Sequence, residues 1–205
     1  MKRSLGTIAS IVVTLGIVGV GIWYLATRDK TAPVSATLWT RGSTQATTTL
    51  LEYSDFQCPA CKVYQQAVTE ILNEFGDKLR FEYRHFPLPN HRNSGLAAFA
   101  AEAAGKQNKF FEMADKLFEK QADWSESSDA RDQFISMARE LGLNEDQFKQ
   151  DIDSQTTKDE IEADLAAGKV DGVNATPSFF INDAKIEPPK DIETFKQVVR
   201  QALGL

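Results

Sequence analysis

The chain has very few of the side chains that bind transition metals. Its 205 residues include two cysteines, Cys58 and Cys61, and two histidines, His85 and His91. A closed zinc site usually takes four ligands, from two cysteine pairs or from one pair and two histidines. The sequence has no second cysteine pair, and nothing else in it indicates a soft metal such as copper. We therefore predict no metal site.

The sequence also lacks clusters of basic residues. Its formal net charge is −6, from 23 basic and 29 acidic side chains. The first thirty residues hold four of the basic side chains and one acidic one, so the rest of the chain carries 19 basic and 28 acidic groups, a net charge of −9. An acidic body without basic clusters is poorly suited to bind phosphate backbones, and we do not expect nucleic acid as a partner.

No charged residue lies between Leu5 and Ala26. As a helix, this run is long enough to span the ~30 Å hydrocarbon core of a bilayer. The basic residues before it favour a cytoplasmic amino terminus, residues 1–4, with the body of the protein outside the cytoplasm. A cleaved signal peptide, cut near residues 34–36, is the alternative, although the apolar run exceeds the ~7–15 residues of a signal core. Both interpretations place residues 31–205 where disulfides persist.

The first part of the body predicts a βαβ unit. Residues 27–46 are polar and rich in Thr and Ser, which is typical of a linker. The β-branched and apolar stretch 47–53 predicts a strand, and helical spacing continues from near Cys58 to about Phe75. Alternation over 79–86 predicts a second strand. Strand, helix and strand in this order imply a parallel strand pair.

Helical patterns then dominate before strands return. Five segments show amphipathic helical spacing, namely 94–107, 108–121, 127–142, 144–153 and 157–170. A strand at 177–182, a short partner strand at 184–187 and a closing helix at 191–203 follow. The strands therefore lie on both sides of a helical insertion.

The cysteine pair opens the first helix directly after a strand. A disulfide across two residues closes a very short loop and stabilises a fold less than a long-range bridge, which argues against a plain staple. At the helix start, unpaired N–H groups and the helix dipole favour a Cys58 thiolate and make it the exposed nucleophile. Pro59 suits the first helical turn, and Cys61 is more shielded, as a resolving thiol would be. This spacing beside a βαβ unit is a redox signature.

A second feature is the stretch 174–178, which precedes the late strand. Proline at the start of a strand cannot donate a ladder hydrogen bond and belongs at an edge or an end. The residues alone do not decide between a cis and a trans bond before Pro177, and trans is the commoner form.

Five motifs resemble, in order, those of the DsbA-type thiol-disulfide oxidoreductases, especially their membrane-anchored or lipid-anchored members: YSDFQCPAC, RHFPLPNH, LAAFAAEAA, KFFEMADKLF and ATPSFFIN. The resemblance covers residues 47–205. It implies a thioredoxin-like α/β fold with an inserted all-helical domain, behind an N-terminal transmembrane helix. The expected boundaries are 1–4 cytoplasmic, 5–26 anchor, 27–46 linker, 47–90 thioredoxin domain, 91–172 helical insertion and 173–205 thioredoxin domain.

The resemblance also implies roles for individual residues. Cys58 corresponds to the nucleophilic cysteine and Cys61 to its buried partner. Thr176 and Pro177 resemble the cis-proline loop, which packs beside the disulfide and presents backbone to a substrate chain as a short β-augmentation.

Glu52 resembles the buried acid that the family places under the active site. Burial would raise its pKa and allow it to relay a proton to Cys61. The alternative is a solvent-facing glutamate on an edge strand. Pro59 and Ala60 fill the variable dipeptide, and the best-known members have histidine where this chain has Ala60. The missing imidazole points to a less oxidising site.

The function implied is that of an extracytoplasmic, membrane-anchored oxidoreductase that introduces disulfides into secreted or surface proteins. Its partners would be reduced or unfolded secreted proteins and a quinone-linked membrane oxidase. We expect no cofactor other than the Cys58–Cys61 disulfide. A reductase or isomerase of the same fold is the alternative, although no dimerisation region typical of isomerases is evident. A non-redox chaperone or a metal-delivery module fits less well.

Overall fold

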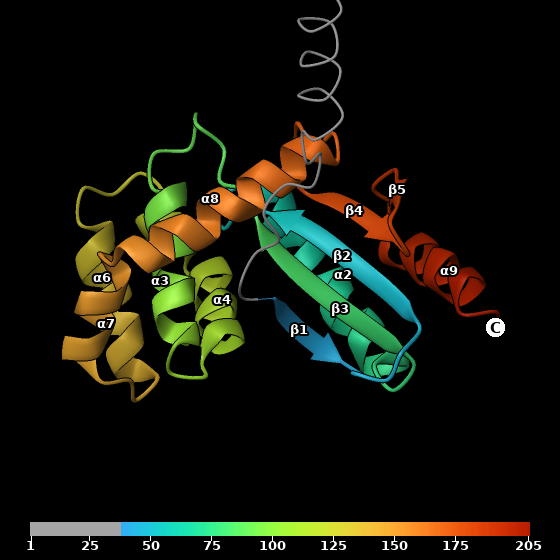
Figure 1. Ribbon diagram of the computed structural model, residues 1–205, viewed down its shortest axis with the longest axis horizontal. Helices are drawn as coiled ribbons and strands as arrows, with labels where there is room; N and C mark the ends of the chain where they lie inside the picture. Colours follow the sequence, from blue (N-terminus) through green and yellow to red (C-terminus); the bar gives the residue numbers. More distant parts are fainter. Residues whose placement is uncertain (1–37) are drawn as a thin grey trace, which may run out of the picture. The chain divides into compact units, whose positions relative to one another are not determined.

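The computed structural model describes residues 38–205 (Figure 1). The expected anchor, residues 5–26, and the first part of the expected linker lie outside the described residues. Within residues 38–205, no helix has the length and apolar character needed to cross a membrane.

A five-stranded sheet in the order β1-β3-β2-β4-β5 forms the centre of the thioredoxin-like domain. Its strands are β1 Trp39–Gly42, β2 Thr48–Ser54, β3 Leu79–His85, β4 Ser178–Ile181 and β5 Ala184–Ile186. Strands β2 and β3 are parallel, which confirms the predicted βαβ unit, and the other pairs are antiparallel. Strand β2 therefore lies in the middle of the sheet, between a strand from each half of the chain.

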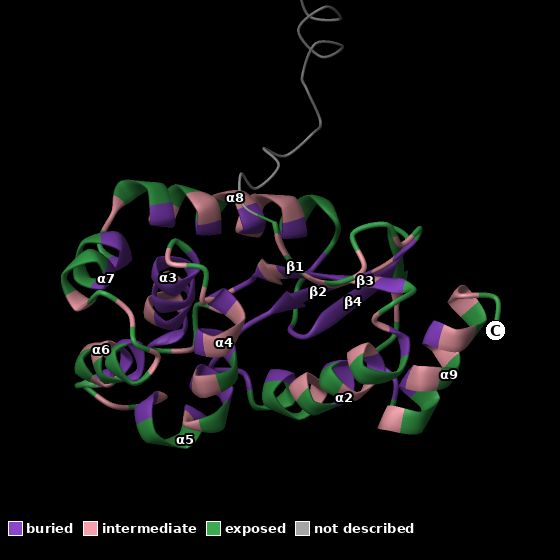
Figure 2. Ribbon diagram, turned by 90° about the horizontal axis from the view of Figure 1, so that it is seen from below, coloured by how far each residue is buried: buried purple, intermediate pink, exposed green. Residues whose placement is uncertain are grey.

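Helices cover both faces of the sheet and form a separate layer beside it. They are α2 Pro59–Phe75, α3 Ser94–Gly105, α4 Phe110–Glu119, α5 Gln121–Trp124, α6 Ala130–Glu140, α7 Glu145–Ile152, α8 Gln155–Val170 and α9 Ile192–Ala202. Helices α2 and α9 lie on one face of the sheet and α8 crosses the other, while α3 to α7 pack at its side (Figure 2). Within residues 38–205 each predicted helix is present, and the short helix α5 is an addition to the prediction.

Strand β1 corrects the predicted linker. Residues 39–42, which the sequence pattern places in the linker, pair with β3 at the edge of the sheet. The Trp39 ring stacks on Phe110 at 4.3 Å, and its Nε1 donates a hydrogen bond to Glu102 at 2.6 Å. A Cβ added to Gly105 would lie 2.3 Å from the indole, so a glycine is what allows this close approach. These contacts, made with residues far along the chain, stabilise strand β1, which the local sequence does not predict.

Two apolar clusters join the layers. The larger one extends from the sheet, α2 and α9 into the helical layer, where Trp124 and Phe134 are fully buried. The smaller one lies between the sheet and the last turns of α8 and contains Tyr53, Phe86 and Phe180. Because β2 leads directly into α2, the start of α2 lies at the carboxyl end of the central strand, next to the helical layer. Ligand sites of open α/β sheets commonly lie at such an end.

Candidate active site

Cys58 and Cys61 lie at the start of α2, as predicted. Cys58 is the N-cap residue with extended backbone (φ −71°, ψ 122°), and Pro59 occupies the first helical position. Pro59 and Ala60 are exposed. Both cysteines are free thiols, so the structure shows the dithiol form. Cys61 has no exposed surface and Cys58 only 6%. Cys58 is therefore less exposed than the sequence pattern suggests, because the loop before β4 covers it.

The surroundings of Cys58 favour its thiolate. The pKa of Cys58 is lowered from 9.0 to about 5, mainly because the Cys61 side chain hydrogen-bonds to its sulfur. The Thr176 side chain and the backbone N–H groups of Cys61 and Ala60 lower it further, while burial opposes them. These N–H groups belong to the first turn of α2, where they have no partner inside the helix. Cys58 is consequently ionised at neutral pH and fits the role of nucleophile.

Cys61 has the opposite electrostatic character. Burial raises the pKa of the Cys61 thiol, and its hydrogen bond to Cys58 and the charge of Glu52 raise it further. Cys61 therefore keeps its proton while Cys58 is ionised. The two sulfurs titrate as a coupled pair, and this asymmetry belongs to the pair and not to either residue alone.

Glu52 lies in β2 beneath the cysteine pair and is only 2% exposed. Its neighbours in the sheet are Tyr83 of β3 and Phe179 of β4, so it sits on a central strand. Burial raises the pKa of Glu52 to about 7, with a further contribution from the charge of Cys58, while the Ser54 hydroxyl opposes the rise. The solvent-facing alternative is therefore wrong. A carboxyl that titrates near neutral pH is suited to give and take protons.

The loop before β4 lies against Cys58. The peptide bond between Thr176 and Pro177 is cis, as the resemblance implied. The Cys58 sulfur lies 3.3 Å from the carbonyl oxygen of Thr176, to which it donates only when it is protonated. This contact brings together the start of α2 and the loop before β4, which are 118 residues apart in the chain. The predicted site residues Glu52, Cys58, Cys61 and Thr176 thus converge at one place.

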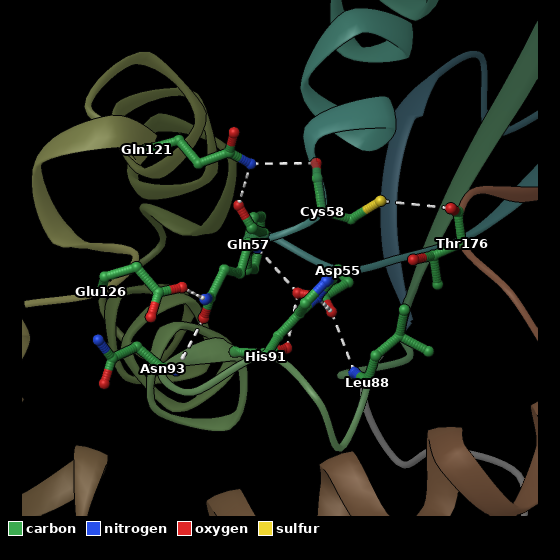
Figure 3. A network of polar contacts seen from close by, with 11 residues as sticks. Asp55, Gln57, Cys58, Leu88, His91, Asn93, Gln121, Glu126 and Thr176 are labelled. Atoms are coloured by element: carbon green, nitrogen blue, oxygen red, sulfur yellow. Dashed lines mark hydrogen bonds and ion pairs between the residues drawn. The ribbon is translucent and has the colours of Figure 1, made fainter.

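Several residues of the site were not predicted from the sequence (Figure 3). The buried carboxylate of Asp55 accepts four hydrogen bonds, from Gln57 N, Leu88 N, Ser94 Oγ and, at 2.6 Å, His91 Nδ1. It ties the loop after β3 to the turn that carries Cys58. The sequence pattern only places Asp55 just after the predicted strand at 47–53. Its place three residues before Cys58 is compatible with an Asx turn and is the one local signal of this role.

Metal-binding clusters are not found in this part of the molecule. Among residues 38–205, no group of three or more His, Cys, Asp or Glu side chains is arranged to hold an ion. His91 bonds to Asp55, and His85 lies in a separate buried contact with Glu102 at 2.9 Å.

Comparisons with known proteins agree with this geometry. The family model described as thioredoxin matches residues 35–201. BdbD from Bacillus subtilis is similar in structure, with 25% identity, a TM-score of 0.72 and coverage of 85% of this chain and 100% of that one. Wolbachia pipientis alpha-DsbA1 has 24% identity, a TM-score of 0.73 and coverage of 82% and 92%, and this likeness shows the fold.

The curated sequence relatives are much longer than this chain. The chain is 35% identical over 159 residues to the Na(+)/H(+) antiporter NhaA of Herminiimonas arsenicoxydans. The match covers 78% of this chain and 24% of the relative, so the chain spans about a quarter of the length of the curated relatives it matches. The family model and the matched structures agree with this geometry: the chain belongs to the thioredoxin family, and its fold resembles that of the DsbA-like proteins.

Proposed function

We propose that this protein is an extracytoplasmic thiol oxidase that introduces disulfides into secreted or surface proteins through Cys58 and Cys61. The observation that carries the proposal is the opposite ionisation of the two thiols. The pKa of Cys58 is lowered to about 5, whereas that of Cys61 is raised. A stabilised thiolate favours the reduced enzyme over its disulfide, and a protein whose reduced form is stable is an oxidant toward other thiols.

The reaction starts from the disulfide form. A substrate thiolate attacks the Cys58 sulfur, a mixed disulfide forms, and Cys61 leaves with the electron pair. A second substrate thiol loses its proton and attacks the substrate sulfur of the mixed disulfide, and Cys58 leaves as a thiolate. Two electrons have then passed to the enzyme, the substrate contains a new disulfide, and the enzyme has the dithiol form seen here.

Two neighbouring groups assist these steps. Cys61 leaves as a high-energy thiolate because its surroundings disfavour charge, so a proton donor nearby accelerates the step. Glu52, with a pKa raised to about 7, is the buried acid next to it. The backbone around Thr176 and Pro177 would pair with an extended substrate segment, which gives affinity with little sequence preference.

The oxidase must be reoxidised after each cycle, and a quinone-linked membrane oxidase is the class of partner that we propose. The uncharged run at residues 5–26 would hold the domain at the membrane beside such a partner.

A disulfide reductase is the second candidate, favoured by Ala60, which stands where the strongest oxidants of the family have histidine. Equilibration of the purified domain with glutathione measures the reduction potential of the pair and decides between the two. We expect a value near the ~−120 mV of a strong oxidase, together with oxidation of a reduced, unfolded test protein. A value near the ~−270 mV of a reductase would refute the oxidase direction.

A further inference from the structure

One side chain of the helical layer reaches the backbone of the catalytic turn, residues 55–58. Gln121, the first residue of α5, is buried and donates from its Nε2 to the carbonyl oxygens of Phe56 at 2.7 Å and of Cys58 at 3.0 Å (Figure 3). These contacts link segments more than sixty residues apart. Since Gln121 contacts neither sulfur in any hydrogen bond of the structure, it acts on the cysteine through the backbone.

Asp55, the first residue of the same turn, also fixes its backbone. The peptide group between Phe56 and Gln57 is bound at both ends, because Gln121 binds its carbonyl and Asp55 Oδ1 accepts from its N–H at 2.8 Å. The N–H of Cys58 donates to the Asp55 carbonyl at 3.0 Å. Hydrogen bonds that share a peptide group polarise one another and strengthen the set. The turn is thus fixed between the helical layer and the loop after β3.

The Cys58 carbonyl is the one that starts α2. It accepts the first helical hydrogen bond, from Lys62 N at 3.2 Å, in addition to the bond from Gln121. The orientation of this carbonyl sets the orientation of the N-cap residue relative to the first turn of the helix. The N–H groups of Ala60 and Cys61, which stabilise the Cys58 thiolate, belong to that turn. If the backbone of Cys58 moved freely, its sulfur would lie close to these N–H groups less of the time, and the thiolate would be less stable.

We propose that Gln121 is a positioning residue that stabilises the Cys58 thiolate by holding the backbone of residues 56–58 against the start of α2. In the disulfide form, the covalent bond to Cys61 already fixes Cys58, so Gln121 contributes less there. In the dithiol form, Gln121 and Asp55 hold the turn instead. Gln121 therefore stabilises the reduced enzyme selectively and makes the pair more oxidising. This inference rests on the proposed function and names the part of the helical layer that tunes it.

The test compares Gln121→Met, which keeps the volume and removes the donors, with the wild-type protein. The rate of Cys58 alkylation as a function of pH measures the pKa of Cys58 and needs no turnover. We expect the midpoint to move up by about one pH unit, because loss of these bonds changes the thiolate population about tenfold. The equilibrium constant for reduction of the Cys58–Cys61 disulfide by glutathione should fall about tenfold. The reduction potential of the pair would then be ~30 mV lower, which makes the pair less oxidising.

Gln121→Glu serves as a second variant because it places carboxylate oxygens against two carbonyl oxygens. It should shift the midpoint in the same direction and further. The matched control is Gln107→Met, which removes hydrogen bonds between a glutamine side chain and the backbone of Asn144, away from the cysteines. We expect the control to titrate like the wild type.

Four outcomes have defined meanings. An unchanged alkylation midpoint in folded Gln121→Met and Gln121→Glu would overturn the positioning role, and so would an equal shift in Gln107→Met. A shifted midpoint in the Gln121 variants alone would support it. A wild-type protein that fails to oxidise thiols would refute the proposed oxidase, yet the thiolate titration would still report on Gln121.

Discussion

Glu52 provides a quantitative test of the buried site through the pH dependence of stability. Its carboxyl has a pKa of about 7 in the folded protein and an ordinary value of 4.5 when exposed. The difference corresponds to about 3 kcal/mol that the folded state loses when this carboxyl ionises. Because Glu52 is only 2% exposed, solvent screening does not reduce this figure appreciably. The perturbation is Glu52→Gln, which keeps the shape and removes the charge.

The sign follows from where the proton is bound. Below pH 4.5 the carboxyl is protonated in the folded and the unfolded state, and its ionisation has no effect on stability. Between 4.5 and about 7 the folded protein holds the proton more tightly, so the free energy of unfolding of the wild type falls as the pH rises. Above that range the whole cost of about 3 kcal/mol is present. Glu52→Gln lacks this loss.

The assay is urea unfolding of the reduced protein at a series of pH values. The stability of Glu52→Gln relative to the wild type should rise by about 3 kcal/mol between acidic and mildly alkaline pH. Glu112→Gln is the control of opposite sign, because Lys109 hydrogen-bonds to Glu112 and lowers its pKa. That variant should lose a little stability toward neutral pH. A difference between Glu52→Gln and wild type that does not depend on pH would refute the buried, raised pKa.

Two further predictions concern the cysteines and the close approach of Trp39. Cys58→Ser should abolish turnover, whereas Cys61→Ser should accumulate mixed disulfides visible on a non-reducing gel; full activity of Cys58→Ser would contradict the mechanism. Gly105→Ala should destabilise the fold by roughly 1–3 kcal/mol in thermal or urea unfolding, because its Cβ would lie 2.3 Å from the Trp39 indole. Gly95→Ala in the same helix has open space and should be neutral or stabilising by up to ~1 kcal/mol; equal losses in both variants would rule out the steric explanation.

The periodic parts of the fold could be predicted from the sequence, because they depend on neighbouring residues. The helix from Pro59 to Phe75 has apolar residues at helical spacing and ends before a glycine, and the structure ends it at the same place. The parallel pairing of β2 and β3 followed from the order of the elements. Strand β1 did not, because four residues, WTRG, contain little strand signal. Their position depends on Trp39 packing against α3 and α4, far along the chain.

The candidate site divides in the same way. Cys58, Cys61 and Pro177 could be found because a cysteine pair at a helix start and a proline before a strand are uncommon local patterns. Gln121 and Asp55 are common residue types without such a pattern. Their roles arise from contacts with backbone groups that only the folded chain brings together, with Gln121 separated from Cys58 by 63 positions. Sequence motifs therefore identify the residues that react. The tertiary structure is needed to identify the residues that position them, here Gln121 and Asp55.

The dipeptide between the cysteines illustrates this difference. Ala60 suggests a weaker oxidant, since it lacks the imidazole of the strongest family members. In the structure, the pKa of Cys58 is nevertheless lowered to about 5, chiefly by the Cys61 side chain, with the Thr176 side chain and two backbone N–H groups contributing. Ala60 takes part through its N–H, which any residue other than proline would supply. The thiolate is thus stabilised mainly by Cys61, with smaller contributions from Thr176 and the first turn of α2, and the side chain at position 60 adjusts a preference that these groups already provide.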